Sequence, residues 1–192
     1  PWSKEGGKNY GASGPVHGVG ADLKGNVYVT DREKNRVVVF DESGKQIGEI
    51  AVKNPDSVAV HPRTGAIYVI RRFCNGWCTH SMILDKFKDF APDAAPVASF
   101  PKFHKNNSPQ MVVTVSGEKT VLWFDGAATD DTPLPDRTQP SKLMALEDKG
   151  AEFAVMPIQY GPAPDMQSDF ARIATDPQRE EVYVSNGENL IY

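Results

Sequence analysis

The stretch Val16–Ile50, VHGVGADLKGNVYVTDREKNRVVVFDESGKQIGEI, decides the fold of this 192-residue chain. It contains four short apolar runs separated by the polar breaks LKGN, DREKN and DESGK. Each break carries the Gly, Asn or Asp residues that tight turns require. We therefore expect four short strands, the first ending near Ala21, joined as an antiparallel meander.

The same succession of strands and turns recurs along the chain with a period of about 40 residues. A second copy begins at Asp56, and its Tyr68 stands where the first copy has Tyr28. A third copy is interrupted by an excursion rich in Pro and Asp, and a fourth, from Ala171, reaches partway through its third strand. A β-sandwich would explain the number of strands but not the recurrence of the same turns in the same order.

A repeat of four strands is typical of a β-propeller blade, because one such sheet cannot bury both of its faces and must stack on its neighbours. The sequence therefore predicts an all-β fold in a single propeller portion over residues 1–192. We expect roughly 3.5 to 4 blades of this kind. Their ranges are about 15–53, 54–105, 106–160 and, incomplete, 165–192.

The segment Gly18–Phe40 resembles the NHL repeat, whose usual form is an apolar strand, a turn acid, the pattern GN-V-Y-V-D and an Arg followed by a second apolar strand. The second and fourth copies resemble it less closely, and the third copy least. The Asp31 and Arg36 spacing of the family is kept, which implies an ion pair across that loop, although Lys34 stands where the family commonly has Asn.

Members of the NHL family usually close with six blades. The resemblance therefore implies that missing blades or another chain complete the ring. The alternative is a compact ring in which residues 1–14 supply the absent outer strand.

Composition limits the classes of partner. The net charge of −4 and the pI near 5.6 exclude the broad basic surface that sequence-independent nucleic-acid binding needs, so no nucleic acid is expected as a partner. No apolar run approaches the roughly 20 residues of a membrane span. The two closely spaced cysteines favour an extracytoplasmic location, periplasmic or secreted, with any export signal already removed.

The stretch Phe73–His80, FCNGWCTH, brings two thiols and an imidazole together. Its spacing fails the Cys-x-x-Cys-His pattern of haem attachment. We expect a disulfide between Cys74 and Cys78, for which Gly76 permits the tight path. Free thiols are one alternative, and a zinc site that includes His80 is another, although such a site lacks a fourth ligand.

The same stretch is expected to lie in a loop on one rim of the propeller, between the second and third strands of the second copy. This loop would run from Arg71 to His80 and present Trp77, flanked by Arg71, Arg72 and Phe73. An ordered aromatic and cationic loop can bind a protein partner or an anionic ligand. The alternative is that Trp77 packs over the edge of the blade.

Two residues at the starts of innermost strands are candidates for the central channel. His17, in the context VHG, is similar to the zinc-binding histidines of propeller lyases that cleave peptidyl-hydroxyglycine. The equivalent positions of the next copies are Asp56, Gln110 and Ala171, so this chain supplies at most one of the three imidazoles. Asp56 is the remaining candidate for calcium, by resemblance to six-bladed lactonases that hold calcium with channel carboxylates.

The sequence therefore predicts a binding module that holds a protein, glycan or small ligand with its rim loops or channel mouth; no cofactor is assigned with certainty, and zinc and calcium are the candidates. The alternative is a metal-dependent enzyme, either a zinc lyase centred on His17 or a calcium-dependent lactonase centred on Asp56. No Gly-x-Ser-x-Gly motif or phosphate-binding Gly loop occurs, and no catalytic residue is assigned.

Overall fold

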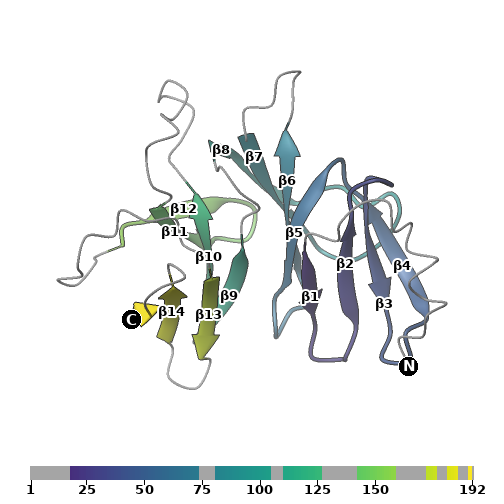
Figure 1. Cartoon of the computed structure of the whole chain (residues 1–192), viewed down its shortest axis with the longest axis horizontal. Helices are drawn as coiled ribbons and strands as arrows, with labels where there is room; N and C mark the ends of the chain where they lie inside the picture. Colours follow the sequence, from purple (N-terminus) through teal and green to yellow (C-terminus); the bar gives the residue numbers. More distant parts are fainter. Residues whose placement is uncertain are drawn as a thin grey trace.

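The computed structural model describes residues 18–73, 81–104, 110–126, 142–158, 172–176, 181–185 and 190–191 (Figure 1). Every regular element in these ranges is a β-strand, which confirms the all-β prediction. The described residues contain no helix long and apolar enough to cross a membrane.

The strands form four antiparallel sheets, and within each sheet the strands pair in chain order. The first sheet consists of β1 (Val19–Ala21), β2 (Val27–Asp31), β3 (Arg36–Phe40) and β4 (Gln46–Ala51). The second consists of β5 (Pro55–Val60), β6 (Ile67–Phe73), β7 (Ser81–Phe87) and β8 (Ala98–His104). These are the two meanders that the sequence predicts.

The third sheet consists of β9 (Met111–Ser116), β10 (Lys119–Gly126), β11 (Lys142–Asp148) and β12 (Phe153–Met156). The fourth consists of β13 (Arg172–Asp176), β14 (Glu181–Ser185) and the short β15 (Leu190–Ile191). The predicted order of strands in the third and fourth copies is therefore also confirmed.

Strand β6 is longer than predicted. Arg71 and Arg72 pair with Ile83 and Met82 of β7, so the two arginines belong to the β6–β7 ladder and not to a loop. Successive side chains of a paired strand point to opposite faces, and a partly exposed strand end tolerates charged side chains on both. A change from apolar to charged residues therefore does not end the strand. The prediction that the loop begins at Arg71 was wrong.

The second sheet lies between the first and the third and is buried on both faces. Ile67 and Val69 pack toward the first sheet, in a cluster with Val37 and Ile50. The alternate residues of β6 pack toward the third sheet, with Leu122 and Phe124 among their neighbours. Because side chains of a strand alternate between faces, one strand with an uninterrupted apolar run supplies both interfaces.

The first strands of successive sheets lie side by side: β1 contacts β5, β5 contacts β9, and β9 contacts β13. The approach of β1 to β5 is close enough to require glycine. A Cβ on Gly18 would lie 2.8 Å from the Cα of Ser57 and 2.9 Å from the carbonyl oxygen of Asp56. Face-to-face sheets with adjoining first strands are consistent with propeller-like blades.

The turn between β1 and β2 is held by the side chain of Asp22. Asp22 Oδ1 accepts hydrogen bonds from the backbone N–H groups of Lys24, at 2.8 Å, and Asn26, at 2.9 Å. Its Oδ2 accepts one from the Tyr28 hydroxyl at 3.1 Å. Burial alone would raise the pKa of Asp22, but these bonds outweigh it and lower the pKa. The expected Asp31–Arg36 ion pair is also present, at 3.1 Å.

Candidate functional site

Four arginines gather where β2 and β6 end and the strands after them begin. We call this group, Arg32, Arg36, Arg71 and Arg72, the arginine rim. Arg71 pairs with Pro55 at the start of β5, so the start of β5 belongs to the same rim. In Figure 1, β6 and β10 run toward the same side of the molecule, as expected for equivalent second strands.

Two arginines of the arginine rim meet at the carboxylate of Asp56, whose side chain is 0% exposed. Arg32, which follows β2 of the first sheet, donates a hydrogen bond from Nη2 to Oδ1 of Asp56. Arg72 of β6 donates from Nε to Oδ2 at 3.2 Å. Burying a carboxylate without compensating charge is costly, and these two guanidinium groups supply compensating charge.

Arg32 is incompletely satisfied. Its Nε is buried, and within the described part of the chain it has no hydrogen-bond partner. A buried donor left unpaired costs about 1–3 kcal/mol. Burial lowers the pKa of Arg32, and the positive charge of Arg72 lowers it further. Burial likewise lowers the pKa of Arg72. The first and second sheets thus hold two like charges close together.

The other two arginines of the rim have carboxylates of their own. Arg71 donates from Nε to Asp85, whose Oδ1 also accepts a hydrogen bond from the Ser99 hydroxyl at 2.6 Å. Arg36 pairs with both Asp31 and Glu49. Burial alone would lower the pKa of Arg36, but these two carboxylates outweigh it and raise the pKa.

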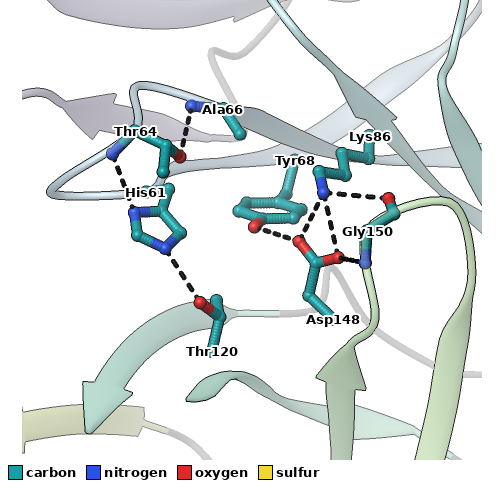
Figure 2. A network of polar contacts seen from close by, with 8 residues as sticks. All are labelled: His61, Thr64, Ala66, Tyr68, Lys86, Thr120, Asp148 and Gly150. Atoms are coloured by element: carbon teal, nitrogen blue, oxygen red, sulfur yellow. Dashed lines mark hydrogen bonds and ion pairs between the residues drawn. The ribbon is translucent and has the colours of Figure 1, made fainter. Parts of the chain in front are cut away.

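A second polar cluster lies at the opposite end of β5, between the second and third sheets. Figure 2 shows it, with His61 and Thr120 on one side and the carboxylate of Asp148 on the other. His61 Nδ1 accepts hydrogen bonds from the backbone N–H groups of Arg63, at 3.0 Å, and Thr64, at 3.1 Å. The proton therefore lies on Nε2, which donates to Thr120 Oγ1 at 2.8 Å.

His61 replaces the turn acid of the first sheet. Asp22 and His61 each follow the first strand of their sheet and each accept backbone N–H bonds two residues ahead. The imidazole has a second nitrogen, which it uses to reach the third sheet. Burial lowers the pKa of His61 and outweighs the opposite effect of Asp148, so the ring is neutral near pH 7. The sequence identifies the turn, but the bond to Thr120 depends on the stacking of the sheets.

Asp148, at the end of β11, joins the third sheet to the second (Figure 2). It accepts hydrogen bonds from the Tyr68 hydroxyl at 2.6 Å, from Lys86 Nζ at 2.9 Å and from the backbone N–H of Gly150 at 2.7 Å. Burial alone would raise the pKa of Asp148, but these bonds outweigh it and lower the pKa. The positive charge of Lys86 balances the negative charge of Asp148 here, as expected of an ion pair that stabilises the packing of two sheets.

Several predicted site residues lie outside the described residues. These are His17, Cys74, Trp77, Cys78 and His80, and the side chain of Phe73 is also not described. The predicted disulfide and the predicted metal role of His17 therefore stay predictions. The described ranges contain no group of three His, Cys, Asp or Glu side chains able to hold a metal ion.

Asp56 does not present a free carboxylate to a channel. Both of its oxygens accept hydrogen bonds from guanidinium groups. Calcium requires carboxylate oxygens whose charge is available to it, and two arginines offset that charge here. The arrangement around Asp56 therefore disfavours a cation at the carboxylate.

Comparison with known proteins adds no relative on which a function could rest: no family model matches the chain, and no curated protein matches it. The functional argument therefore rests on the geometry of the arginine rim.

Proposed function

We infer that this chain is the greater part of an NHL-like β-propeller, completed by further blades or by another chain, and that it acts as a binding module. The repeated four-stranded meanders, the adjoining first strands and the Asp31–Arg36 pair support the propeller assignment. Fold alone does not determine function, so the role has to be argued from the site.

The observation that carries the binding role is the cluster of Arg32 and Arg72 around buried Asp56. Maintaining a buried ion cluster at the edge of two sheets costs stability that an apolar contact would not. Arginines at the rim of a scaffold of this kind are positioned to contact a partner, which binds across the loops between second and third strands.

We test this role with peptide and glycan arrays probed by the purified full-length protein. The expected result is a set of bound array members whose signal is lost in Arg32→Ala and retained in Arg63→Ala. Arg63 is a matched control, because it lies at the opposite end of β5 and bonds to the carbonyl oxygen of Gly117. If Arg32→Ala fails to fold, Arg32→Gln serves in its place.

Binding that both variants leave unchanged would overturn the role of the arginine rim. Stoichiometric zinc or calcium in the purified protein, together with lyase or lactonase turnover, would instead establish the metal-dependent enzyme that is the alternative function.

The closely spaced Cys74 and Cys78 support an extracytoplasmic location in the same proposal, because a disulfide there needs an oxidising compartment. Thiol labelling of protein purified without reductant checks it, and two labelled cysteines would contradict it.

A further inference from the structure

The last strands of the first three sheets differ in how their free edges are protected. Among the strands that the structure describes, β4, β8 and β12 each pair with a single neighbour. Edge strands avoid pairing with other chains through charges, prolines and bulges. Strand β4 contains Glu49, β8 contains Pro101, and each shifts register against its neighbour. Strand β12 has none of these features, because Phe153–Met156 are all apolar and pair with β11 in one unbroken register.

The turn before β12 shows which of its backbone groups point away from β11. The N–H of Lys149 donates to the carbonyl oxygen of Glu152 at 2.9 Å, so these two residues form a hydrogen-bonded pair. Hydrogen-bonded and non-hydrogen-bonded pairs alternate along an antiparallel ladder. Phe153 and Val155 therefore both belong to non-hydrogen-bonded pairs with β11. Their backbone N–H and C=O groups point outward from the sheet.

Strand β12 is fixed to the core and also accessible. Phe153 packs against the cluster between the second and third sheets, with its ring centroid 6.4 Å from that of Tyr68. Val155 is 59% exposed, although it is apolar. An apolar strand that is held in place and directs unused backbone donors and acceptors outward can accept a further strand.

We propose that β12 pairs antiparallel with β12 of a second copy of this chain, about a two-fold axis at Ala154. In this register Phe153 lies opposite Val155 of the second copy, and the two residues exchange backbone hydrogen bonds. The two Ala154 residues form a non-hydrogen-bonded pair at the axis, where side chains come closest and a small side chain fits. A register centred on Val155 would instead place Pro157, which has no N–H, opposite Phe153.

A second copy is the occupant that symmetry and charge favour. Two-fold pairing covers the unprotected edge of both copies at once and leaves neither β12 open to a further strand. Strand β12 carries no charge, so pairing with itself brings no like charges together, whereas self-pairing of β4 would bring two copies of Glu49 close to each other. The contact involves the last strand of a sheet and not the adjoining first strands, so it is separate from the completion of the ring.

Sedimentation equilibrium of the purified protein over a concentration series tests the dimer. The interface is small, so we expect a weak dimer that forms at about 0.1 mM and above. Val155→Pro should abolish the dimer, because it removes an outward N–H that the ladder with β11 does not use. Val155→Thr is the matched control. It keeps this N–H and the branched side chain, so its dimerisation constant should stay within about fivefold of the wild-type value.

Hydrogen exchange of the wild type gives a readout that does not depend on the folding of Val155→Pro. The N–H groups of Phe153 and Val155 should exchange more slowly at about 1 mM protein than at about 10 µM, whereas that of Ala154, which bonds to β11, should be protected at both concentrations. Exchange that does not depend on concentration would overturn the proposal. A protein that stays monomeric at about 1 mM would do the same, as would a dimer that a folded Val155→Pro variant still forms.

Discussion

Asp56 and Asp148 occupy comparable places and are surrounded differently. Each is a carboxylate with little or no exposed surface, and each is joined to a cation from a neighbouring sheet, Asp56 to Arg32 and Asp148 to Lys86. Around Asp148 the Tyr68 hydroxyl and one ammonium group complete a balanced set. Around Asp56 two guanidinium groups meet, and among the residues that the structure describes, the buried Nε of Arg32 has no partner.

The difference teaches how the balance of charges and donors distinguishes two buried ion clusters. A balanced pair with satisfied donors and acceptors needs nothing further from solvent. A cluster with a buried, unpartnered donor instead carries a cost of about 1–3 kcal/mol. The two clusters lie at opposite ends of β5, about 16 Å apart at 3.3 Å per residue. One strand thus connects a cluster with balanced charges to a cluster with an unpartnered buried donor.

The largest expected effect is that of Asp56→Asn. This change leaves two guanidinium groups together without their carboxylate, and removing one partner of a buried ion cluster costs about 3–5 kcal/mol. The free energy of unfolding, measured by urea denaturation, should fall by this amount.

The control is the double variant Asp56→Asn/Arg32→Leu, which removes the repulsion along with one cation. It should recover part of the lost stability, because Arg72 then no longer faces a second positive charge. If Asp56→Asn costs less than about 1 kcal/mol, Asp56 is not the charge that holds the two arginines together.

A smaller effect is expected for Asp148→Asn, at about 1–3 kcal/mol. The amide oxygen can still accept the hydrogen bond of Tyr68, and Lys86, with 14% of its side chain exposed, has some access to water. Urea denaturation under the same conditions makes the two substitutions comparable. If Asp148→Asn lowers the free energy of unfolding as much as Asp56→Asn does, the balance of charges around each carboxylate does not determine the size of the loss.

The strands and turns were predictable because their signals are local. Asp22 closes its turn with partners two to six residues away, and the 40-residue spacing of Tyr28 and Tyr68 aligns the first two sheets. Apolar runs between such turns fix which segments pair. The sequence therefore predicts all four sheets, including the short third strand of the last one.

The ion clusters were not predictable in the same way. Arg32 and Asp56 are 24 residues apart, and Tyr68 and Asp148 are 80 residues apart. Their contacts depend on how one sheet is stacked on the next, which turn chemistry does not encode. The sequence singled out Asp56 and Arg72 for other reasons, a channel metal and a rim loop, and it did not single out Arg32. For the second cluster the sequence does contain a signal: His61 occupies the position where the first copy has the turn acid Asp22.

The smallest expected effect is a pH dependence that originates in His61. Its pKa is lowered in the folded state from the ordinary value of 6.5, mainly by burial, so the unfolded chain binds more protons just below that value. The stabilising contribution of neutral His61 is therefore complete above about pH 6.5 and declines as the pH falls toward the lowered pKa. Asp148, Lys86 and Arg63 carry the charges that face the ring, and the pKa of Asp148 is lowered from its ordinary value of 3.8, so this carboxylate stays ionised over this range.

His61→Asn isolates this contribution, because the Asn side-chain oxygen can accept the same two backbone hydrogen bonds but does not titrate. At pH 8 the variant should lose about 1 kcal/mol, the value of the bond to Thr120. Between pH 7.5 and pH 5.5 its unfolding free energy should fall less steeply than that of the wild type, as thermal melts at constant ionic strength would show. Parallel slopes for the two proteins would mean that another group titrates over this range, and that protonation of His61 at Nδ1, which breaks its two backbone hydrogen bonds, does not change the stability.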